Sequence, residues 1–316
     1  MKVLISDELA PECADIFKKG GIDVDVKVGL APEALKAIIG EYEGLVVRSA
    51  TKVTADILSA ASKMKVIGRA GAGVDNIDVK AAAEKGAIVM NTPGGNSVAV
   101  AELTLGMMLG MSRMIPQATA STKAGKWEKK KFKGHEVTGK TLGIVGYGRI
   151  GKELAKRARG LCMNVIAYDP AASDAAKAAA AAEGVQLLSL DEVAAKADYV
   201  SFHVPLLDST KHMCDAALIA KMKKGAYIIN CARGGIVDEA AVCEALHSGH
   251  LAGAALDVYE AGDCAHENPL FAEPGFICTP HLGASSVEAQ EKVALQIAEQ
   301  MVDYLKNGNA VNVVKA

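Results

Sequence analysis

Short apolar runs alternate with helical patterns along the first part of the chain. Up to residue 91 the apolar runs read KVLIS, DVDVKV, GLVVRS, VIGRA and AIVMN. The helical patterns between them read PECADIFKKG, PEALKAIIGEY, TADILSAAS and DVKAAAEKG. Strands that alternate with helices in this way predict βαβ units and a parallel sheet.

A second series of apolar runs follows a long helical stretch from about Ser97 to Gln117. These runs read TLGIVG, NVIAYD, VQLL, DYVSFHV, AYIIN, GAALDV and FICTP. They predict a second parallel sheet. A last amphipathic pattern, roughly Ser285 to Asn307, has no strand after it. We therefore expect the chain to begin one domain, build a second inside it and return to complete the first.

The composition is typical of a globular protein with a small-molecule partner. The 316 residues are 50% apolar and 23% charged, which leaves room for two domains. A net charge of −2 and a pI near 6.4 provide no overall field that would attract nucleic acid or an anionic membrane. The uncharged apolar run Leu103–Ser112 is too short to span a bilayer, so it predicts a buried helix.

Several features point away from export and from metal chemistry. None of the seven cysteines belongs to a CxxC pair, and charge at Asp7 and Glu8 comes too early for a signal peptide, so we expect a reducing cytoplasm. His247 and His250 have HxxH spacing but no third ligand in view, and we expect no metal site. The low-complexity segment 171–184 predicts an exposed alanine helix.

A glycine loop, Gly146-Tyr-Gly148-Arg-Ile-Gly151, follows the strand TLGIVG and opens the helix RIGKELAKRARG. In that context the three glycines meet the needs of a tight turn, close backbone approach and close packing of helix on strand. A pyrophosphate would lie at the helix N-terminus. Asp169 follows Gly151 by eighteen residues at the end of the next strand, where a carboxylate accepts the adenosine ribose hydroxyls. Because it would also repel a 2′-phosphate, we predict NAD over NADP.

Charged residues follow several predicted strands of both sheets. Arg233 lies in NCARGG and His281 in TPHLG, and the carboxyl ends of parallel strands face the ligand crevice. In the first sheet Arg48 and Arg69 end two strands, and the turn 71–76 beside them offers backbone N–H groups to an anion. Exposed arginines in solvated loops are the alternative interpretation of this pair.

These motifs resemble those of the NAD-dependent D-2-hydroxyacid dehydrogenases. The matching segments are the glycine loop with Asp169, HVPL, CARGGIVDE, GAALDVYE and TPHLGASS. More narrowly, VRSATKVTADIL, GRAGAGVDNIDV, VMNTPGGNS, IPQATAS, GKWEKKKF and GKTLGIVGYGRIGKE look like the D-3-phosphoglycerate dehydrogenases. The resemblance covers essentially the whole chain. It implies oxidation of 3-phospho-D-glycerate to 3-phosphohydroxypyruvate with NAD, the first step of L-serine biosynthesis.

The resemblance also implies the fold and the division of labour. We expect an α/β protein of two doubly wound parallel-sheet domains, in which a Rossmann-type cofactor domain is inserted into a flavodoxin-like substrate domain. The substrate-binding domain would comprise residues 1–96 and 284–316, and the NAD-binding domain residues 97–283. A regulatory small-molecule-binding domain follows this point in some relatives, and we expect no feedback by serine through such a domain here.

Residue roles follow from the chemistry together with the resemblance. His281 is the candidate base for the hydroxyl proton, and Arg233 can bind the carboxylate and the developing ketone. The expected cofactor-binding residues are Gly146, Gly148, Arg149, Ile150, Gly151, Asp169, Val204, Pro205, Cys231, Asp257, His281 and Gly283. By resemblance, Asp257 would hold the nicotinamide carboxamide. The expected substrate-binding residues are Arg48, Arg69, Gly71, Gly73, Val74, Asn96, Trp127 and Lys129.

The basic run Lys129–Lys131 beside Trp127 has three interpretations. It forms a solvated face, a nucleic-acid patch, or a loop that reaches the substrate site of a partner subunit, as the resemblance implies. The overall acidity argues against nucleic acid. The third interpretation predicts a homodimer through the cofactor domain, with a tetramer left open.

The chain departs from the family at one catalytic position. The family holds its catalytic histidine with a glutamate, and an ungapped alignment places Gly262 there. Asp263 is the better substitute by proximity, and Glu260 is a second neighbour. This departure keeps two alternatives open: an NAD-sensing binding protein with weak turnover, and another D-2-hydroxyacid dehydrogenase such as a glyoxylate or hydroxypyruvate reductase.

Overall fold

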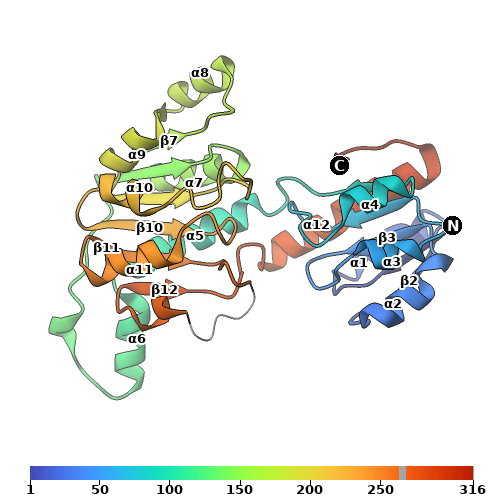
Figure 1. Cartoon of the computed structure of the whole chain (residues 1–316), viewed down its shortest axis with the longest axis horizontal. Coiled ribbons are helices and arrows are strands. Elements are labelled where there is room, and N and C mark those ends of the chain that lie inside the picture. The colour runs from blue at the N-terminus through green and yellow to red at the C-terminus, as the bar shows by residue number, and fades with distance from the viewer. Residues whose placement is uncertain (263–267, 316) are drawn as a thin grey trace. The chain divides into compact units, whose positions relative to one another are not determined.

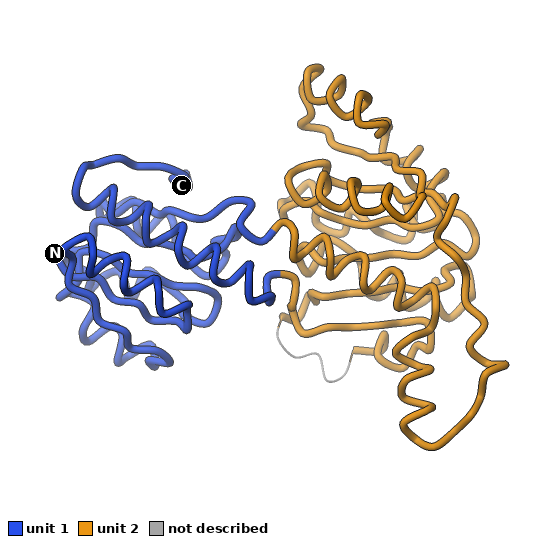
Figure 2. The backbone as a smooth tube through the Cα atoms, turned by 180° about the vertical axis from the view of Figure 1, so that it is seen from behind, with its two compact units in different colours: residues 1–96, 284–316 blue, residues 97–283 orange. Residues whose placement is uncertain are grey.

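The computed structural model of the protein describes residues 1–262 and 268–315. The chain divides into two compact units, which Figure 2 distinguishes by colour. Unit 1 comprises Met1–Asn96 and Ala284–Ala316, and unit 2 comprises Ser97–Gly283. The chain therefore leaves unit 1, forms unit 2 without interruption and returns to unit 1.

Unit 1 is built on a five-stranded sheet in which every pairing is parallel. Its strands are β1 (Lys2–Ile5), β2 (Asp23–Val26), β3 (Gly44–Val47), β4 (Val66–Arg69) and β5 (Ile88–Met90). The spatial order β2-β1-β3-β4-β5 is the flavodoxin-like order. The five apolar runs predicted as strands are thus confirmed. Residues near the C-terminus lie beside β5, where Val313 forms an antiparallel bridge with Met90.

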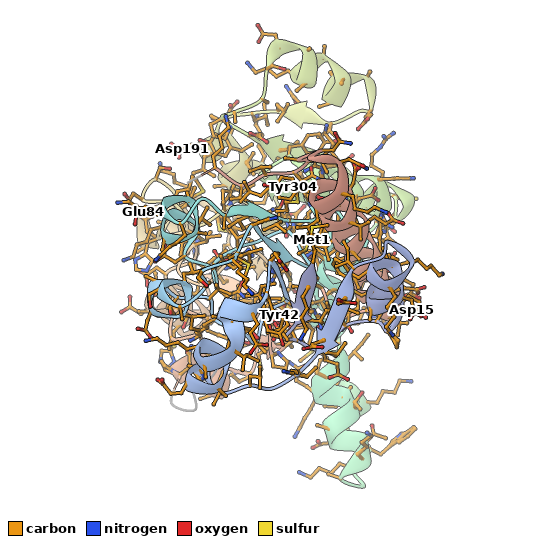
Figure 3. The ribbon with its side chains drawn as sticks, turned by 90° about the vertical axis from the view of Figure 1, so that its right-hand side faces the viewer. Met1, Asp15, Tyr42, Glu84, Asp191 and Tyr304 are labelled. Carbon is orange, nitrogen blue, oxygen red and sulfur yellow. The ribbon has the colours of Figure 1, made fainter. Side chains whose placement is uncertain are left out.

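Helices cover both faces of this sheet. One face carries α1 (Glu12–Lys19) and α12 (Val287–Asn307), which lie side by side in Figure 3, where Asp15 marks α1 and Tyr304 marks α12. The other face carries α2 (Pro32–Ile38), α3 (Ala55–Ser59) and α4 (Val79–Glu84), with the short 3₁₀ helix η1 (Ile39–Glu41) after α2. A side chain at Gly68 would overlap Met301 of α12, so this glycine allows the helix to pack closely on β4.

Unit 2 is built on a seven-stranded sheet, also parallel throughout. Its strands are β6 (Thr141–Val145), β7 (Asn164–Tyr168), β8 (Gln186–Leu187), β9 (Tyr199–Phe202), β10 (Ala226–Asn230), β11 (Leu251–Leu256) and β12 (Phe276–Cys278). The order β12-β11-β10-β9-β6-β7-β8 reverses direction between β6 and β9. Such a switch point is where doubly wound sheets bind their ligands, just outside the carboxyl ends of the strands.

Two hydrophobic clusters fill the faces of the second sheet. One packs against α5 (Ser97–Ser112), α7 (Arg149–Gly160) and α8 (Asp174–Ala182). The other packs against α9 (Leu190–Lys196), α10 (Ala216–Lys221) and α11 (Glu239–His247). The remaining elements are α6 (Ile115–Lys123), η2 (Lys129–Lys131) and η3 (Pro269–Ala272). The alanine helix predicted over 171–184 is α8, and only Ala180 of its residues is buried.

The predicted helical stretch from Ser97 to Gln117 is interrupted. It ends as α5 at Ser112, and α6 starts at Ile115 with a bend of 66° between the two. Met114 adopts a left-handed conformation (φ 53°) and Pro116 lies in the first turn of α6. Proline lacks the N–H that would continue the helix by bonding to the carbonyl of Ser112, and that carbonyl accepts from the N–H of His135 at 2.7 Å instead.

Within the described residues, no single helix is long and apolar enough to cross a membrane. The pair α5 and α6 satisfies the length and composition together, but only across the bend. The apolar residues of α5 are largely buried in the core of unit 2, with Met107, Met108 and Met111 among them. Their hydrophobicity is therefore accounted for by packing within the unit.

Candidate active site

The glycine loop joins β6 to α7 at the switch point of unit 2. Gly146 has φ 98°, and a Cβ there would lie 2.6 Å from the carbonyl oxygen of His203 on the adjacent strand. A Cβ at Gly151 would overlap the carbonyl oxygen of Gly146. A Cβ at Gly148, in contrast, would meet no heavy atom within 4 Å. The outer glycines are thus required by the protein itself, whereas the middle one borders open space.

The N-terminus of α7 and Asp169 complete this part of the site. Gly148 is the N-cap of α7 and provides no side chain to bind the first N–H groups of the helix. Unsatisfied N–H groups and the positive end of the helix dipole favour an anion there. Asp169 directly follows β7, and one carboxylate oxygen accepts a hydrogen bond from the backbone N–H of Tyr147 at 3.0 Å. The loop and the carboxylate therefore fit a dinucleotide, with the diphosphate at the helix and the ribose at Asp169.

Other residues predicted to contact the cofactor border the same switch point. Arg149 and Pro205 are exposed, and Ile150 and Val204 are half-buried. Between β9 and Val204 lies His203, whose ring Nε2 is 2.8 Å from the hydroxyl of Ser201 and whose Nδ1 is buried. Burial lowers the pKa of His203 to about 4 because the charged imidazolium loses its hydration. This imidazole is neutral near pH 7.

The turns after β10, β11 and β12 bring three predicted site residues to neighbouring strand ends. Arg233, Asp257 and His281 follow these strands, and Figure 1 shows the three strands side by side. The backbone N–H of Asp257 donates to the carbonyl of Asn230, and the N–H of His281 donates to the carbonyl of Asp257, each at 2.9 Å. The turns are therefore joined to one another through backbone hydrogen bonds, and the His281 side chain is exposed.

Asn230, which sequence reasoning missed, organises the turn that carries Arg233. Its side chain is buried, its carbonyl oxygen accepts from the N–H of Ala232 at 3.0 Å, and its amide donates to the carbonyl of Arg233 at 2.8 Å. The half-buried Arg233 donates from Nη1 to the carbonyl of Ala232 at 2.7 Å. An asparagine at the end of a buried strand is a typical turn former, and that position is a signal that could have identified it.

Three further residues of the cofactor list surround this region. Cys231 is buried, its thiol lies 3.6 Å from the sulfur of Met107, and burial raises its pKa to about 12. Asp257 is fully buried and accepts hydrogen bonds from the turn 279–283. Gly283 is one of the donors, at 2.8 Å. The thiol of Cys231 stays protonated at neutral pH, so it is not a nucleophile here.

Gly262 occupies the position of the family glutamate, and Glu260 and Asp263 are the neighbouring acids that could replace it. Gly262 is exposed with φ 72°, and its N–H donates to the carbonyl of Tyr259 at 3.1 Å. Glu260 does not bind His281. Its carboxylate lies 2.8 Å from Nε2 of His212, and its backbone N–H donates to Glu239 at 2.7 Å. Asp263 lies outside the described residues, so its role remains a prediction.

In unit 1, Arg48 follows β3 at the switch point between β1 and β3. Its Nη2 donates to the carbonyl of Ala284 at 3.4 Å, and with the amide of Gln290 suitably turned, the amide oxygen accepts from Nη1 at 3.3 Å and from Nη2 at 3.2 Å. Burial lowers the pKa of Arg48, and the negative charges of Asp7 and Glu8 oppose that shift. The guanidinium is therefore held in a fixed position.

Asp7, also missed by sequence reasoning, fixes the loop after β3. Its buried carboxylate accepts from the backbone N–H groups of Arg48 at 2.6 Å, Ala50 at 3.2 Å and Thr51 at 3.0 Å, and from the Thr51 hydroxyl at 2.5 Å. Asn76 joins this loop to the next by donating to the carbonyls of Arg48 and Thr51. The loops after β3 and β4 are thus held together by the buried side chain of Asp7 and the half-buried side chain of Asn76.

The turn after β4 contains Arg69 and the glycines predicted to bind substrate. Gly71 has φ 147°, and the guanidinium of Arg69 lies where a side chain at Gly71 would be. Gly73 is half-buried, and Val74 is half-buried and packs against the core of unit 1. Asn96, at the end of the first segment of unit 1, is half-buried as well.

Trp127 and Lys129 lie on the segment between α6 and β6. Figures 1 and 2 show α6 and this segment projecting from the body of unit 2. The indole of Trp127 is 87% exposed, and Lys129 begins the exposed 3₁₀ helix η2. Tryptophan is enriched at protein–protein interfaces relative to the rest of the surface.

Among the described residues, no group of three His, Cys, Asp or Glu side chains could hold a metal ion. The two histidines with HxxH spacing have separate partners. His247 lies 3.7 Å from Glu273, and the ring of His250 lies 2.9 Å from the carbonyl of Ile219. The two imidazole rings therefore do not share a position at which one metal ion could bind both.

Comparison with known proteins gives consistent matches. Residues 105–283 match the family described as D-isomer specific 2-hydroxyacid dehydrogenase, NAD binding domain. The D-3-phosphoglycerate dehydrogenase of Homo sapiens is 51% identical over 315 residues, which cover 100% of this chain and 58% of that protein. The chain therefore spans somewhat more than half the length of such curated relatives.

Two solved structures resemble the whole chain. The TT0316 protein from Thermus thermophilus has a TM-score of 0.90 and 33% identity, and the match covers 100% of each chain. The NAD⁺-bound 3-phosphoglycerate dehydrogenase of Entamoeba histolytica has a TM-score of 0.84 and 31% identity, and the match covers 100% of this chain and 99% of that one.

Proposed function

The chain belongs to the D-isomer specific 2-hydroxyacid dehydrogenases, and on that basis we propose that it oxidises 3-phospho-D-glycerate to 3-phosphohydroxypyruvate. NAD, when bound, accepts the hydride from the substrate carbon. The relatives named D-3-phosphoglycerate dehydrogenase support this substrate, and L-serine biosynthesis is the pathway that their name implies. The observation that carries the proposal is the pair of arginines at the carboxyl ends of β3 and β4, because a phosphorylated acid needs fixed cations.

The second unit would supply the acid-base chemistry. The exposed imidazole of His281 takes the hydroxyl proton of the substrate as the hydride leaves its carbon. Arg233 binds the substrate carboxylate and the oxygen that becomes a ketone, for which its planar guanidinium is suited. The joined turns after β10, β11 and β12 support this assignment, since they keep both residues at adjacent strand ends.

The first unit would recognise the substrate. Arg48 and Arg69 bind the phosphate with backbone N–H groups of the turn 71–76, and Asn96 contributes a polar contact. Arg48 is suited to this role because Asp7 and Gln290 fix its backbone and its side chain before any ligand arrives. Asp263 is proposed as the acid that orients His281 in place of the family glutamate.

We further propose a homodimer formed through unit 2 and a cytoplasmic location. In the dimer, Trp127 and Lys129 extend toward the substrate site of the second subunit. The exposure of Trp127 on a projecting segment supports this. All six described cysteines are free thiols, which fits a reducing compartment.

The Arg48→Ala variant tests the proposed substrate. We expect the KM for 3-phospho-D-glycerate to rise roughly tenfold to a hundredfold, since a charge-assisted pair with phosphate is lost. The KM for an unphosphorylated 2-hydroxy acid should stay within about twofold. Both are measured as initial rates of NAD reduction.

Lys65→Ala is the matched control because Lys65 is an exposed cation just before β4, at the opposite end of the sheet from Arg48. It should leave both KM values unchanged. Equal changes for the two substrates in Arg48→Ala would favour a general 2-hydroxyacid dehydrogenase. Tight NAD binding without turnover in the wild type would favour an NAD-sensing protein.

A further inference from the structure

Asp257 is the most completely enclosed charged residue near the candidate base. It follows β11 directly and has no exposed surface. Its Oδ1 accepts from the hydroxyl of Thr279 at 2.6 Å and from the N–H of Leu282 at 2.7 Å, and its Oδ2 accepts from the N–H of Gly283 at 2.8 Å. All three donors belong to the one turn that carries His281, so the carboxylate contacts that turn on both sides of the histidine.

The backbone of Asp257 holds the same turn from a third point. Its carbonyl accepts from the N–H of His281 at 2.9 Å. His281 itself has φ 57°, a left-handed conformation that costs energy for a residue with a side chain. Such a conformation persists only where the surroundings determine it. Here the surroundings are the carboxylate and the carbonyl of Asp257.

The turn is also shaped to fit this carboxylate. A Cβ at Gly283 would lie 3.2 Å from Oδ2 of Asp257, so a larger residue would push the donor N–H away. Charge-assisted hydrogen bonds of 2.6–2.8 Å are strong, and a buried carboxylate needs several of them. An asparagine at 257 would keep the shape but would lack the charge, and its NH₂ group would face N–H donors.

We infer that Asp257 is a positioning residue that fixes His281 for proton transfer by clamping the turn 279–283. The inference rests on the proposed function, because His281 is a base only within it. This role is additional to the one expected by family resemblance, in which the carboxylate holds the nicotinamide carboxamide. Loosening the clamp at Thr279 predicts loss of turnover with intact cofactor affinity, whereas replacing Asp257 itself predicts loss of both.

The experiment compares Thr279→Val with Thr279→Ser and Asp257→Asn. Valine keeps the shape of threonine but removes the hydroxyl donor, and serine restores it. For each variant we would measure kcat with 3-phospho-D-glycerate, the Kd of NAD by calorimetry without substrate, and amide hydrogen exchange of the peptide covering 279–284. Thr279→Val keeps the inference testable even if Asp257→Asn fails to fold.

We expect Thr279→Val to lower kcat roughly tenfold or more, since small misplacements of a base are costly. Exchange of the 279–284 peptide should become faster, and the Kd of NAD should stay within about twofold. Thr279→Ser should recover most of the lost kcat. Asp257→Asn should lower kcat further and also raise the Kd of NAD, since it removes the clamp together with the expected cofactor contact.

Ser112→Ala is the matched control for general destabilisation. Ser112 is a buried hydroxyl of α5 that lies 2.9 Å from the hydroxyl of Tyr199 in the core of unit 2. Its removal should lower Tm about as much as Thr279→Val does, without lowering kcat. A loss of kcat in Ser112→Ala that equals the loss in Thr279→Val would overturn the inference.

Two other results would also overturn it. If the Kd of NAD rises in Thr279→Val as much as kcat falls, the Thr279 hydroxyl supports cofactor binding and not the position of His281. If exchange becomes faster while kcat is unchanged, the turn does not govern His281. Failure of the proposed function is distinct, since the wild type would then not oxidise 3-phospho-D-glycerate. In that case the same variants are compared on an unphosphorylated 2-hydroxy acid and by hydrogen exchange.

Discussion

Each unit of the molecule has a glycine-rich turn after a central strand, 146–151 in unit 2 and 71–76 in unit 1, and the two turns differ in what occupies them. In unit 2 the loop 146–151 leads into the twelve-residue helix α7, whose N-cap Gly148 provides no capping side chain. Protein atoms crowd Gly146 and Gly151, whereas no heavy atom would meet a Cβ at Gly148 within 4 Å. This loop leaves backbone N–H groups and space for a ligand.

In unit 1 the turn 71–76 is filled by side chains of its own unit. The guanidinium of Arg69 covers Gly71, and the side chain of Asn91 donates to the carbonyl of Ala72 at 2.6 Å. The short helix that follows, α4, has Asp78 as its N-cap, and that carboxylate accepts from the N–H of Ala81 at 2.9 Å. The N-terminus of α4 is therefore already capped by a side chain of the protein.

Glycine content alone therefore does not identify a dinucleotide site. The distinguishing features are the uncapped helix N-terminus and the glycine that borders open space. In unit 1 the positive charge for anion binding lies in the arginine side chains, next to the backbone N–H groups of the turn 71–76, which fits the proposed binding of a phosphate. In unit 2 it lies in the backbone, which fits a diphosphate of fixed geometry.

The largest effect is expected from Gly146→Ala, which would break the loop of unit 2. Alanine would be strained at φ 98°, and its Cβ would clash with the His203 carbonyl at 2.6 Å. Strain and overpacking together should cost about 2 to 5 kcal/mol of unfolding free energy. Thermal unfolding should show the loss, along with weaker NAD binding. Wild-type stability in this variant would mean that the loop is not held against β9.

A smaller effect is expected from pH, through the histidine beside that loop. The folded pKa of His203, about 4, lies below the unfolded value near 6.5, so the unfolded chain takes up a proton that the folded one does not. The stability is fully present above pH 6.5 and is lost as pH falls toward 4, by about 3 kcal/mol in total.

The variant His203→Gln should reduce this loss, as measured by urea unfolding at several pH values. His247→Gln is the control because His247 is an exposed ring at the end of α11. An unchanged pH dependence in His203→Gln would show that the buried ring titrates normally.

The smallest change in stability is expected from Gly148→Ala, which sharpens the comparison between the two turns. With φ −77° and no atom within 4 Å, alanine meets no clash, so only its poorer N-cap preference should reduce stability, by about 0.5 kcal/mol. The Kd of NAD should nevertheless rise roughly tenfold, since the methyl group enters the space left for the diphosphate.

Asp78→Ala provides the converse control in unit 1. Loss of the N-cap of α4 should cost about 1 kcal/mol and leave the affinity for NAD unchanged. An unaltered Kd for NAD in Gly148→Ala would contradict the assignment of open space to the cofactor.

The fold could be predicted from the sequence because each strand of both sheets is a short apolar run between helical patterns. The strand ends then placed Arg48, Arg69, Arg233 and His281 at the carboxyl edges of their sheets, as the structure has them. The glycine loop was identifiable because its spacing, the preceding strand and Asp169 occur together. These signals are local or follow from parallel-sheet geometry.

The supporting interactions could not be predicted because they join residues far apart in the chain. Asp7 binds the loop at residues 48–51, and Glu260 binds His212 instead of His281. The clamp between Asp257 and the turn 279–283 likewise depends on how β11 and β12 pair. The break at Met114 had a local signal in Pro116, but the apolar run before it continues the helical pattern without a stop.

The central claim is that this chain oxidises a phosphorylated 2-hydroxy acid with NAD. The most direct measurement is the initial rate of NAD reduction by the purified chain with 3-phospho-D-glycerate and, in parallel, with D-glycerate. We expect kcat/KM to be roughly a hundredfold or more higher for the phosphorylated acid, since two arginines are proposed to bind its phosphate. Equal values for the two acids, or no NAD reduction with either, would contradict the claim.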